Sequence, residues 1–177
     1  MCVLFITTNK NKVEEAKAVL GMDVVQVDKE YPEIQGSSEE VVLFAMDILR
    51  EGEPFIVEDT SLHIEALSGF PGPFASYVQK TIGNTGVLKL MEGVHNRAAF
   101  FETCIGLSYN GKKIFKGRCY GSIALEPRGI SGFGFDPVFI PEGDERTFAE
   151  MSLHEKNLMS HRAVAFRALR EHLENLI

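Results

Sequence analysis

The sequence is short of cysteine, of long apolar runs and of positive charge. Its three cysteines are Cys2, Cys104 and Cys119, and an odd number without zinc-knuckle spacing indicates free thiols in a reducing cytosol. The longest apolar run beyond the N-terminus, Val41 to Met46, is far too short to span a membrane. The N-terminal apolar run lacks a basic flank and is too short for a signal peptide, so we expect a cytoplasmic protein.

Acidic residues outnumber basic ones by 25 to 18, which gives a net charge of −7. An acidic chain is a poor candidate for binding nucleic acid or an anionic membrane. A small phosphate ligand stays possible, because it needs only a local patch of positive potential. The chain also lacks internal repeats, low-complexity tracts and long linkers, so we expect one domain over residues 1–177.

Local patterns predict an α/β fold with a mixed sheet. A buried strand at Val3–Thr7, a helix ending at Gly21 and a second strand at Val24–Val27 are typical of a parallel unit. Further on, Asn110-Gly111 predicts a hairpin between two long β-rich segments, which adds antiparallel strands. Capping boxes are predicted to start two helices, at Ser37 and at Ser152.

The first candidate site is the polar turn between the first strand and the first helix. The start of a helix offers backbone N–H groups and the positive end of its dipole, which suit a triphosphate. Hydroxyl, amide and ammonium groups add to these donors; the residues are Thr7, Thr8, Asn9, Lys10, Asn11 and Lys12. The turn is not a Walker A loop, because its glycine spacing is absent. The alternative is a solvated turn with surface lysines.

The second candidate site is Glu58-Asp59-Thr60. A buried strand is predicted at Phe55–Val57, with these residues at its carboxyl end and a separate strand from Leu62. Ligands bind at that end of open α/β sheets, and adjacent carboxylates suit a hard divalent ion such as magnesium. Glu33 could supply another oxygen. The alternative is that these carboxylates cap helices or face water.

Two further candidate sites lie in the C-terminal third of the chain. In the glycine-rich segment from 131 to 137, an aromatic ring could stack on a flat ligand and Asp136 could accept hydrogen bonds from it. Downstream basic residues near a helix start provide donors for carbonyl or phosphate oxygens. The candidates are Phe133, Gly134, Phe135, Asp136, Lys156, His161 and Arg162. The alternatives are a tight loop with one core aromatic and a structural histidine.

Together these motifs resemble the inosine triphosphate pyrophosphatase family. The resemblance covers nearly the whole chain in order. It is carried by Thr7-Thr8-Asn9 with Lys12, Tyr31-Pro-Glu-Ile-Gln-Gly36, Val57-Glu-Asp-Thr-Ser-Leu62, Gly69-Phe-Pro-Gly-Pro73, Gly132-Phe-Gly-Phe-Asp-Pro137, Thr147-Phe-Ala-Glu-Met151, Glu155-Lys-Asn157 and Ser160-His-Arg162.

The resemblance implies an elongated mixed sheet flanked by helices, with two lobes around a central cleft, and a homodimer. It implies magnesium-dependent hydrolysis of ITP, dITP and XTP to the monophosphate and pyrophosphate. Glu33 and Asp59 would bind magnesium, with Asp59 as the base for the attacking water. Phosphates would be held by Thr7, Thr8, Asn9 and Lys12, and Thr60 would touch the substrate. The base pocket would comprise Phe133 to Asp136, Lys156, His161 and Arg162.

Two other functions remain open from the sequence. One is a non-catalytic purine nucleotide-binding protein, against which the Glu58-Asp59 pair argues, because a binder gains little from carboxylates beside phosphates. The other is a related pyrophosphatase for modified pyrimidine nucleotides. Pyrophosphate release from a panel of nucleotides separates the three.

Overall fold

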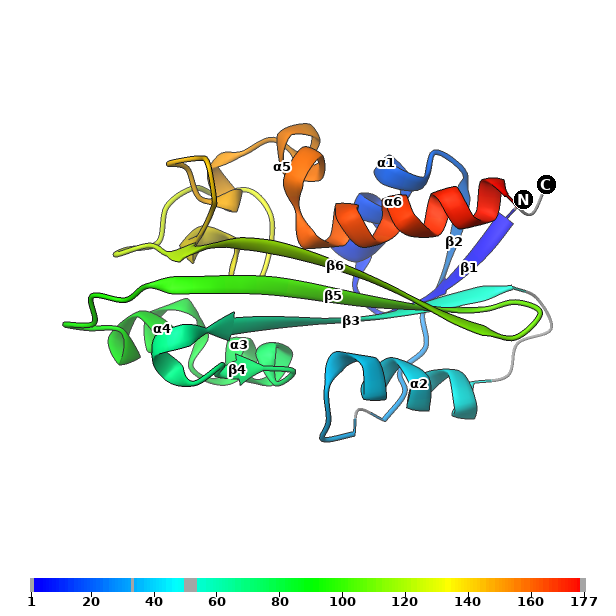
Figure 1. The fold of residues 1–177 in the computed structure, drawn as a ribbon, viewed down its shortest axis with the longest axis horizontal. Coiled ribbons are helices and arrows are strands. Elements are labelled where there is room, and N and C mark those ends of the chain that lie inside the picture. The colour runs from blue at the N-terminus through cyan, green and yellow to red at the C-terminus, as the bar shows by residue number, and fades with distance from the viewer. Residues whose placement is uncertain (1, 33, 50–53, 176–177) are drawn as a thin grey trace.

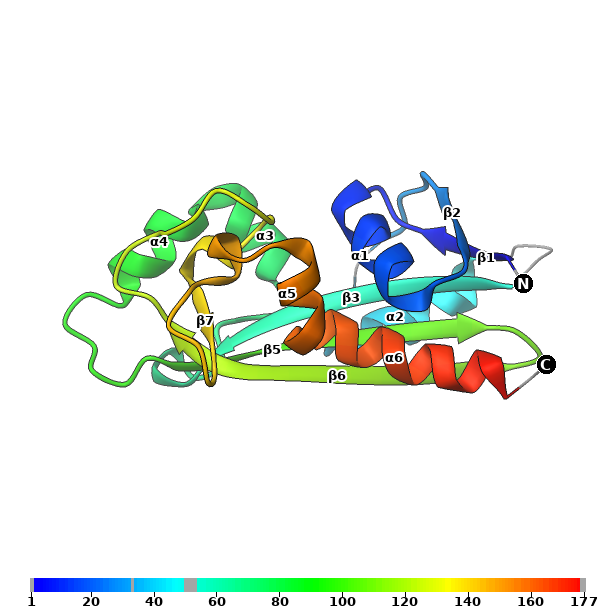
Figure 2. The same cartoon turned by 90° about the horizontal axis from the view of Figure 1, so that it is seen from above.

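The computed structural model describes residues 2–32, 34–49 and 54–175 and shows an elongated α/β molecule (Figures 1 and 2). Its mixed sheet has the strand order β2-β1-β3-β5-β6-β7, with β4 also paired to β3. The predicted fold class is confirmed. The strands are β1 Cys2–Ile6, β2 Asp23–Val27, β3 Phe55–Ile64, β4 Pro71–Gly72, β5 Ala98–Ser108, β6 Lys112–Ile123 and β7 Phe139–Pro141.

Helices cover both sides of this sheet. In Figure 1, α1 and α6 lie above the long hairpin of β5 and β6, and α2 lies below it. The helices are α1 Lys10–Leu20, α2 Ser38–Ile48, α3 Ala75–Thr81, α4 Gly83–Leu90, α5 Leu153–Met159 and α6 His161–Glu174. Within the described ranges, no helix is long and apolar enough to cross a membrane.

The predicted local signals form as expected. Strand β1 pairs in parallel with both β2 and β3, and α1 ends at Gly21, whose φ of 64° is left-handed. Asn110 and Gly111 also have positive φ at the tip of the β5–β6 hairpin. Both predicted capping boxes, at Ser37 and at Ser152, are present. These features depend on neighbours in sequence, which is why local reasoning finds them.

The prediction for β3 was wrong. Instead of two short strands, one ten-residue strand runs through Glu58 and Asp59, and a 3-10 turn, Glu65–Leu67, follows it. The whole of β3 pairs with β5, so hydrogen bonding to its neighbour continues past the carboxylates. The carboxylates therefore lie in the middle of a strand rather than at its carboxyl end.

The apolar core falls into clusters that define two lobes. At the end near the chain termini, α1 and α6 pack on the sheet through residues such as Phe5, Ile56 and Phe166. At the other end, α3, α4 and the segment around β7 pack through residues such as Leu62, Val78 and Phe139. Helix α2 covers the opposite face of the first lobe. Because β3, β5 and β6 run through both ends, the sheet holds the two lobes together (Figure 2).

Candidate active site

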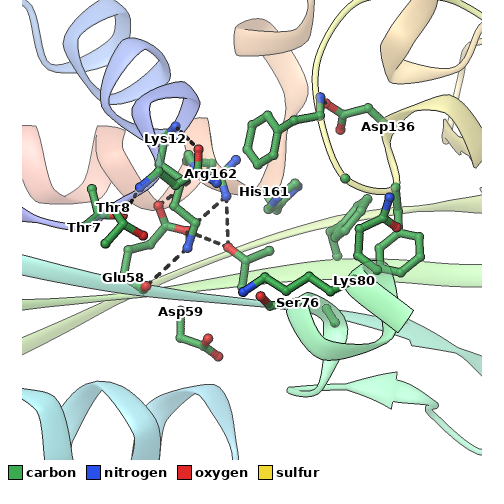
Figure 3. Close-up of a pocket in the computed structure, with 18 of the residues that line it drawn as sticks. Thr7, Thr8, Lys12, Glu58, Asp59, Ser76, Lys80, Asp136, His161 and Arg162 are labelled. Carbon is green, nitrogen blue, oxygen red and sulfur yellow. Dashed lines mark hydrogen bonds and ion pairs between the residues drawn. The ribbon is translucent and has the colours of Figure 1, made fainter. Parts of the chain in front are cut away.

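A cavity of about 580 Å³ lies between the two lobes. Its wall combines the β1–α1 turn, the middle of β3, one face of α3, the 133–136 loop and the start of α6 (Figure 3). These segments are far apart in sequence, and the cavity collects most of the predicted site residues. The predicted residues on its wall are Thr7, Thr8, Asn9, Lys12, Glu58, Asp59, Thr60, Phe133, Gly134, Phe135, Asp136, His161 and Arg162.

The cavity coincides with a gap in the sheet. Strand β1 pairs with β3 only at Phe55 and Ile56, and β4 pairs with it only at Leu62 and His63. Between these two contacts, no strand among the described residues covers this edge of β3. Since successive side chains of a strand point to opposite faces, an open edge lets side chains from both faces reach one ligand.

The cavity is lined by Thr7, Thr8 and Asn9 of the β1–α1 turn and by Lys12 of α1, but not by Lys10 or Asn11. Lys10 and Asn11 are exposed instead, because successive helical positions turn by about 100° around the axis. Asn9 caps α1, and its Oδ1 accepts from the N–H groups of Asn11 and Lys12. The side chain of Asn9 thus already binds two of the backbone N–H groups that were predicted to bind a phosphate.

Glu58 is the partner of Arg162. Its Oε2 and Oε1 accept from Nε and Nη2 of Arg162 at 2.9 and 3.0 Å, and the Oγ1 of Thr60 donates to its Oε1 at 2.6 Å. Lys12 lies 3.4 Å from the same Oε1. Burial alone would raise the pKa of Glu58, but Arg162 and Lys12 outweigh it and hold the pKa well below its usual range. Glu58 is therefore a buried anion that holds cations in place.

Asp59 is placed differently from its neighbour. It lines the cavity from the opposite face of β3, and its Oδ2 is buried. In Figure 3 its side chain points away from Arg162. Glu33, the other predicted magnesium ligand, lies outside the described residues.

Glu15, which was not among the predicted site residues, completes a buried charge network. Its Oε1 accepts from Nζ of Lys156 at 2.8 Å, and its Oε2 accepts from Nη1 of Arg162 at 2.7 Å. Burial opposes ionisation of Glu15, but the two cations outweigh it and lower its pKa. A signal was available, because Glu15 lies four residues before Val19 on the apolar stripe of the first helix.

Lys156 lies behind the cavity wall. Its ammonium also donates to Oδ2 of Asp136 at 2.6 Å and lies 5.0 Å from the ring centre of Phe133. The same Oδ2 accepts from the N–H of Phe133 at 2.8 Å. Asp136 was predicted to accept hydrogen bonds from a ligand. Its Oδ2 instead accepts from the backbone of its own loop and from Lys156, which stabilises the loop on the side away from the cavity. Burial raises the pKa of Asp136, against the effect of Lys156.

The aromatic end of the cavity contains Phe133, Phe135 and His161. Phe135 belongs to the core, while Phe133 is half-buried beside the guanidinium of Arg162. His161 is 2% exposed and stacks on Phe101 with ring centres 4.4 Å apart. Burial, then Arg162 and Lys156, hold its pKa well below the usual value, so the ring is neutral.

The Nδ1 of His161 is buried and has no hydrogen-bond partner among the described residues. Buried ring nitrogens normally find a partner. A ligand atom in the cavity is a natural one, because His161 forms part of the wall.

Helix α3 contributes residues to the cavity that were not predicted from the sequence. This helix presents Ser76, Gln79 and Lys80 to the cavity. The helix begins at Ala75, directly after the Gly69-Phe-Pro-Gly-Pro73 motif and Phe74. Nothing in these residue types indicates a site, because only the packing of α3 on the second lobe turns them toward it.

Comparison with known proteins identifies the class to which this fold and site belong. The Ham1 family model matches residues 3–172. The dITP/XTP pyrophosphatase of Pyrococcus horikoshii is 49% identical over 98% of this chain and 97% of its own. That of Methanopyrus kandleri is 48% identical over 99% and 97%. The chain therefore belongs to the Ham1 family.

Solved structures agree with this assignment. The Ham1 protein of Staphylococcus aureus has a TM-score of 0.84 with 25% identity and covers 100% of both chains. A nucleoside-triphosphatase / dITP/XTP pyrophosphatase of Mycobacterium abscessus has a TM-score of 0.72 with 30% identity over 96% of this chain and 98% of its own. The family resemblance drawn from the motifs is confirmed.

Proposed function

We propose that this protein hydrolyses the non-standard purine nucleoside triphosphates ITP, dITP and XTP to the monophosphate and pyrophosphate. The observation that carries the proposal is a single cavity holding Lys12, Asp59 and His161. A lysine suits phosphate oxygens, a carboxylate suits a divalent ion or a reacting water, and a histidine suits a purine ring. The names of the relatives, dITP/XTP pyrophosphatase, point the same way.

The phosphates would lie against the first lobe. Thr7, Thr8 and Asn9 surround the start of α1, whose dipole favours negative charge. Lys12 adds its ammonium from one turn into the helix, where Glu58 fixes it. Thr60 is held between Glu58 and Arg162 and would touch the substrate from β3.

Asp59 would accept a proton from the water that attacks the α-phosphorus. The bond between this phosphorus and the oxygen bridging to the β-phosphate would break, and pyrophosphate would leave. Asp59 and Glu33 would also hold magnesium, and the bound metal would neutralise charge on phosphate oxygens. Magnesium usually takes one or two carboxylates and completes its shell with water and substrate phosphates. Asp59 lines the cavity with a buried Oδ2, so it would supply one such carboxylate.

The purine would occupy the aromatic end, where Phe133 offers a stacking face. Hypoxanthine and xanthine carry an acceptor oxygen at position six, whereas adenine carries an amino donor there. A neutral His161 with its protonated ring nitrogen toward that oxygen would pair with ITP and XTP. With ATP, the guanidinium of Arg162, which can only donate, would face the amino group of adenine, at a cost of about 1–3 kcal/mol for each unmet group. Arg162 would add its one N–H not used in the buried network.

A substrate panel at one fixed magnesium concentration tests this function. We expect inorganic pyrophosphate and the monophosphate as products from dITP, ITP and XTP, with far slower release from dATP. Release of orthophosphate would contradict the proposed bond cleavage. Preference for modified pyrimidine triphosphates would show that the enzyme acts on another class of substrate. Binding of dITP without turnover would show that the protein binds nucleotides but does not hydrolyse them.

We further propose that residues 1–177 act as one domain in a cytoplasmic homodimer. One sheet runs through both lobes, which supports a single unit. Exposed aromatic side chains support association, since Tyr77 is 69% and Tyr120 is 54% exposed. Light scattering on the eluting protein measures the mass, and twice the chain mass of 19.7 kDa is expected.

A further inference from the structure

The basic side chains that line the cavity differ in whether they already have an interaction partner. Lys12 is paired with Glu58, Arg162 is bound by Glu58 and Glu15, and Lys29 has an interaction of its own. Lys80 also lines the cavity, but it makes no ion pair or hydrogen bond with any residue that the structure describes. Its ammonium is therefore available to an anionic ligand.

The position of Lys80 directs it to one end of the cavity. It lies four residues after Ser76 on α3, so the two side chains share a face of the helix. Both line the cavity from the lobe opposite α1. In Figure 3 the side chain of Lys80 extends toward Glu58 and Asp59 and away from Asp136. Lys80 thus faces the polar end rather than the aromatic end.

The cavity around Lys80 is lined by several carboxylates, so a cation there is electrostatically favourable. Glu30, Glu58, Asp59 and Asp136 all line the cavity, and a triphosphate brings several more negative charges. Glu58 already pairs with Lys12 and Arg162, so neither of these cations is wholly available to the triphosphate. A cation from the second lobe would offset this charge across the cleft.

We propose that Lys80, assisted by the hydroxyl of Ser76, binds the phosphate oxygens of the substrate from the second lobe. The inference rests on the proposed function and adds a substrate-binding residue to it. Lys12 and Lys80 would then hold the triphosphate from opposite sides. Lys80 would bind the phosphates, which all nucleoside triphosphates share. It would therefore not affect the preference for one base over another, which would depend on the aromatic end of the cavity.

The test compares Lys80→Ala and Lys80→Arg with a matched control. Lys89→Ala removes a lysine that is exposed on α4 in the same lobe and does not line the cavity. For Lys80→Ala we expect KM for dITP and XTP, and the inhibition constant of inorganic pyrophosphate, all to rise about tenfold, or about 1.4 kcal/mol. Lys80→Arg should restore most of the affinity, and Lys89→Ala should stay within twofold of the wild type.

Two outcomes would overturn the inference. One is a KM for dITP within twofold of the wild type in Lys80→Ala. The other is a changed preference between dITP and dATP with unchanged inhibition by pyrophosphate, which would assign Lys80 to the base. Calorimetric titration with inorganic pyrophosphate needs no turnover. It therefore tests Lys80 even if the wild type proved inactive on dITP, a result that would refute the proposed function alone.

Discussion

Arg162 is the residue on which the buried charges of the site depend. Four of its hydrogen bonds are directed to Glu58, Glu15 and Thr60. A guanidinium has five N–H donors, so one is left for a ligand. Its main contribution is therefore electrostatic support of the cavity wall, and under the proposed function its remaining N–H would meet the purine beside His161.

Replacing Arg162 should lower the free energy of unfolding more than it changes the preference between purine bases. In Arg162→Met, Glu58 and Glu15 lose their shared cation in a buried site, and such a loss costs about 3–5 kcal/mol. Urea unfolding measures the change. The control is Arg118→Met, which breaks the more exposed ion pair with Glu102 and should cost less than about 1 kcal/mol. Equal costs for the two variants would contradict the role of the buried network.

His161 should make the free energy of unfolding depend on pH. In the unfolded chain a histidine gains a proton below about pH 6.5, whereas in the folded chain burial keeps His161 neutral. The unfolded state therefore binds more protons as pH falls, and stability is lost. Between pH 7.5 and 5.0 this loss is about 2 kcal/mol.

The variant His161→Gln should remove that part of the pH dependence, as measured by urea unfolding at each pH. His95→Gln is the control, since this side chain is exposed. An unchanged pH dependence in His161→Gln would mean that the ring becomes charged in the folded protein.

Asp59 should be required for turnover. Asp59→Asn keeps the size of the side chain but removes the carboxylate, and loss of a positioned base lowers turnover by at least about a hundredfold. Initial rates of pyrophosphate release from dITP measure the effect. Asp47→Asn alters an exposed carboxylate on α2 and should leave the rate unchanged. A nearly wild-type rate in Asp59→Asn would place the base elsewhere.

At the scale of the elements, the position of α6 decides the site. The helix begins at His161 and continues through Arg162, so any shift of its first turn moves both residues. Gly117 of β6 lets the backbone of this turn pack directly on the sheet, since a Cβ there would overlap the carbonyl oxygen of His161. A glycine in the strand thus sets how closely α6 approaches the sheet.

Gly117→Ala should therefore displace α6. We expect a cost of about 1–3 kcal/mol in the free energy of unfolding and at least a tenfold loss of kcat/KM for dITP. In the comparison variant Gly106→Ala, the new methyl group overlaps side chains of Val42 and Met46 on α2, on the face of the sheet away from α6 (Figure 1). Its activity should stay closer to the wild type. Equal loss in both variants would show that general overpacking is responsible.

At the scale of the molecule, one sheet carries two lobes and leaves a gap between them. The long strands β3, β5 and β6 fix the distance between the lobes, while the open edge of β3 provides the space for a ligand. A nucleotide bound in this gap would contact both lobes at once, because both line the cavity. Binding should then stabilise the whole chain.

A non-hydrolysable dITP analogue with magnesium should raise the free energy of unfolding. At a hundred times its dissociation constant the gain is about 2.7 kcal/mol, because the ligand binds only the folded state. Thermal unfolding at several ligand concentrations measures it. Inosine at equal concentration lacks the phosphates and should give a much smaller shift. An equal shift with inosine would mean that the phosphates add nothing across the cleft.

The sequence by itself determined the local elements and the family. Gly21, the Asn110-Gly111 tip and the two capping boxes fold as predicted, because each depends on neighbours a few residues away. The ordered motifs also predicted most of the residues that line the cavity. Residue type and spacing were enough for these features.

Only the tertiary structure decided how those residues are used. Glu15 and Glu58 bind Lys156 and Arg162 across more than a hundred residues, and α3 turns Lys80 into the cavity. The edge of β3 stays open because its partner strands end before they meet, which depends on pairing registers rather than composition. Contacts so distant along the chain are set by packing between lobes, and no local pattern encodes them.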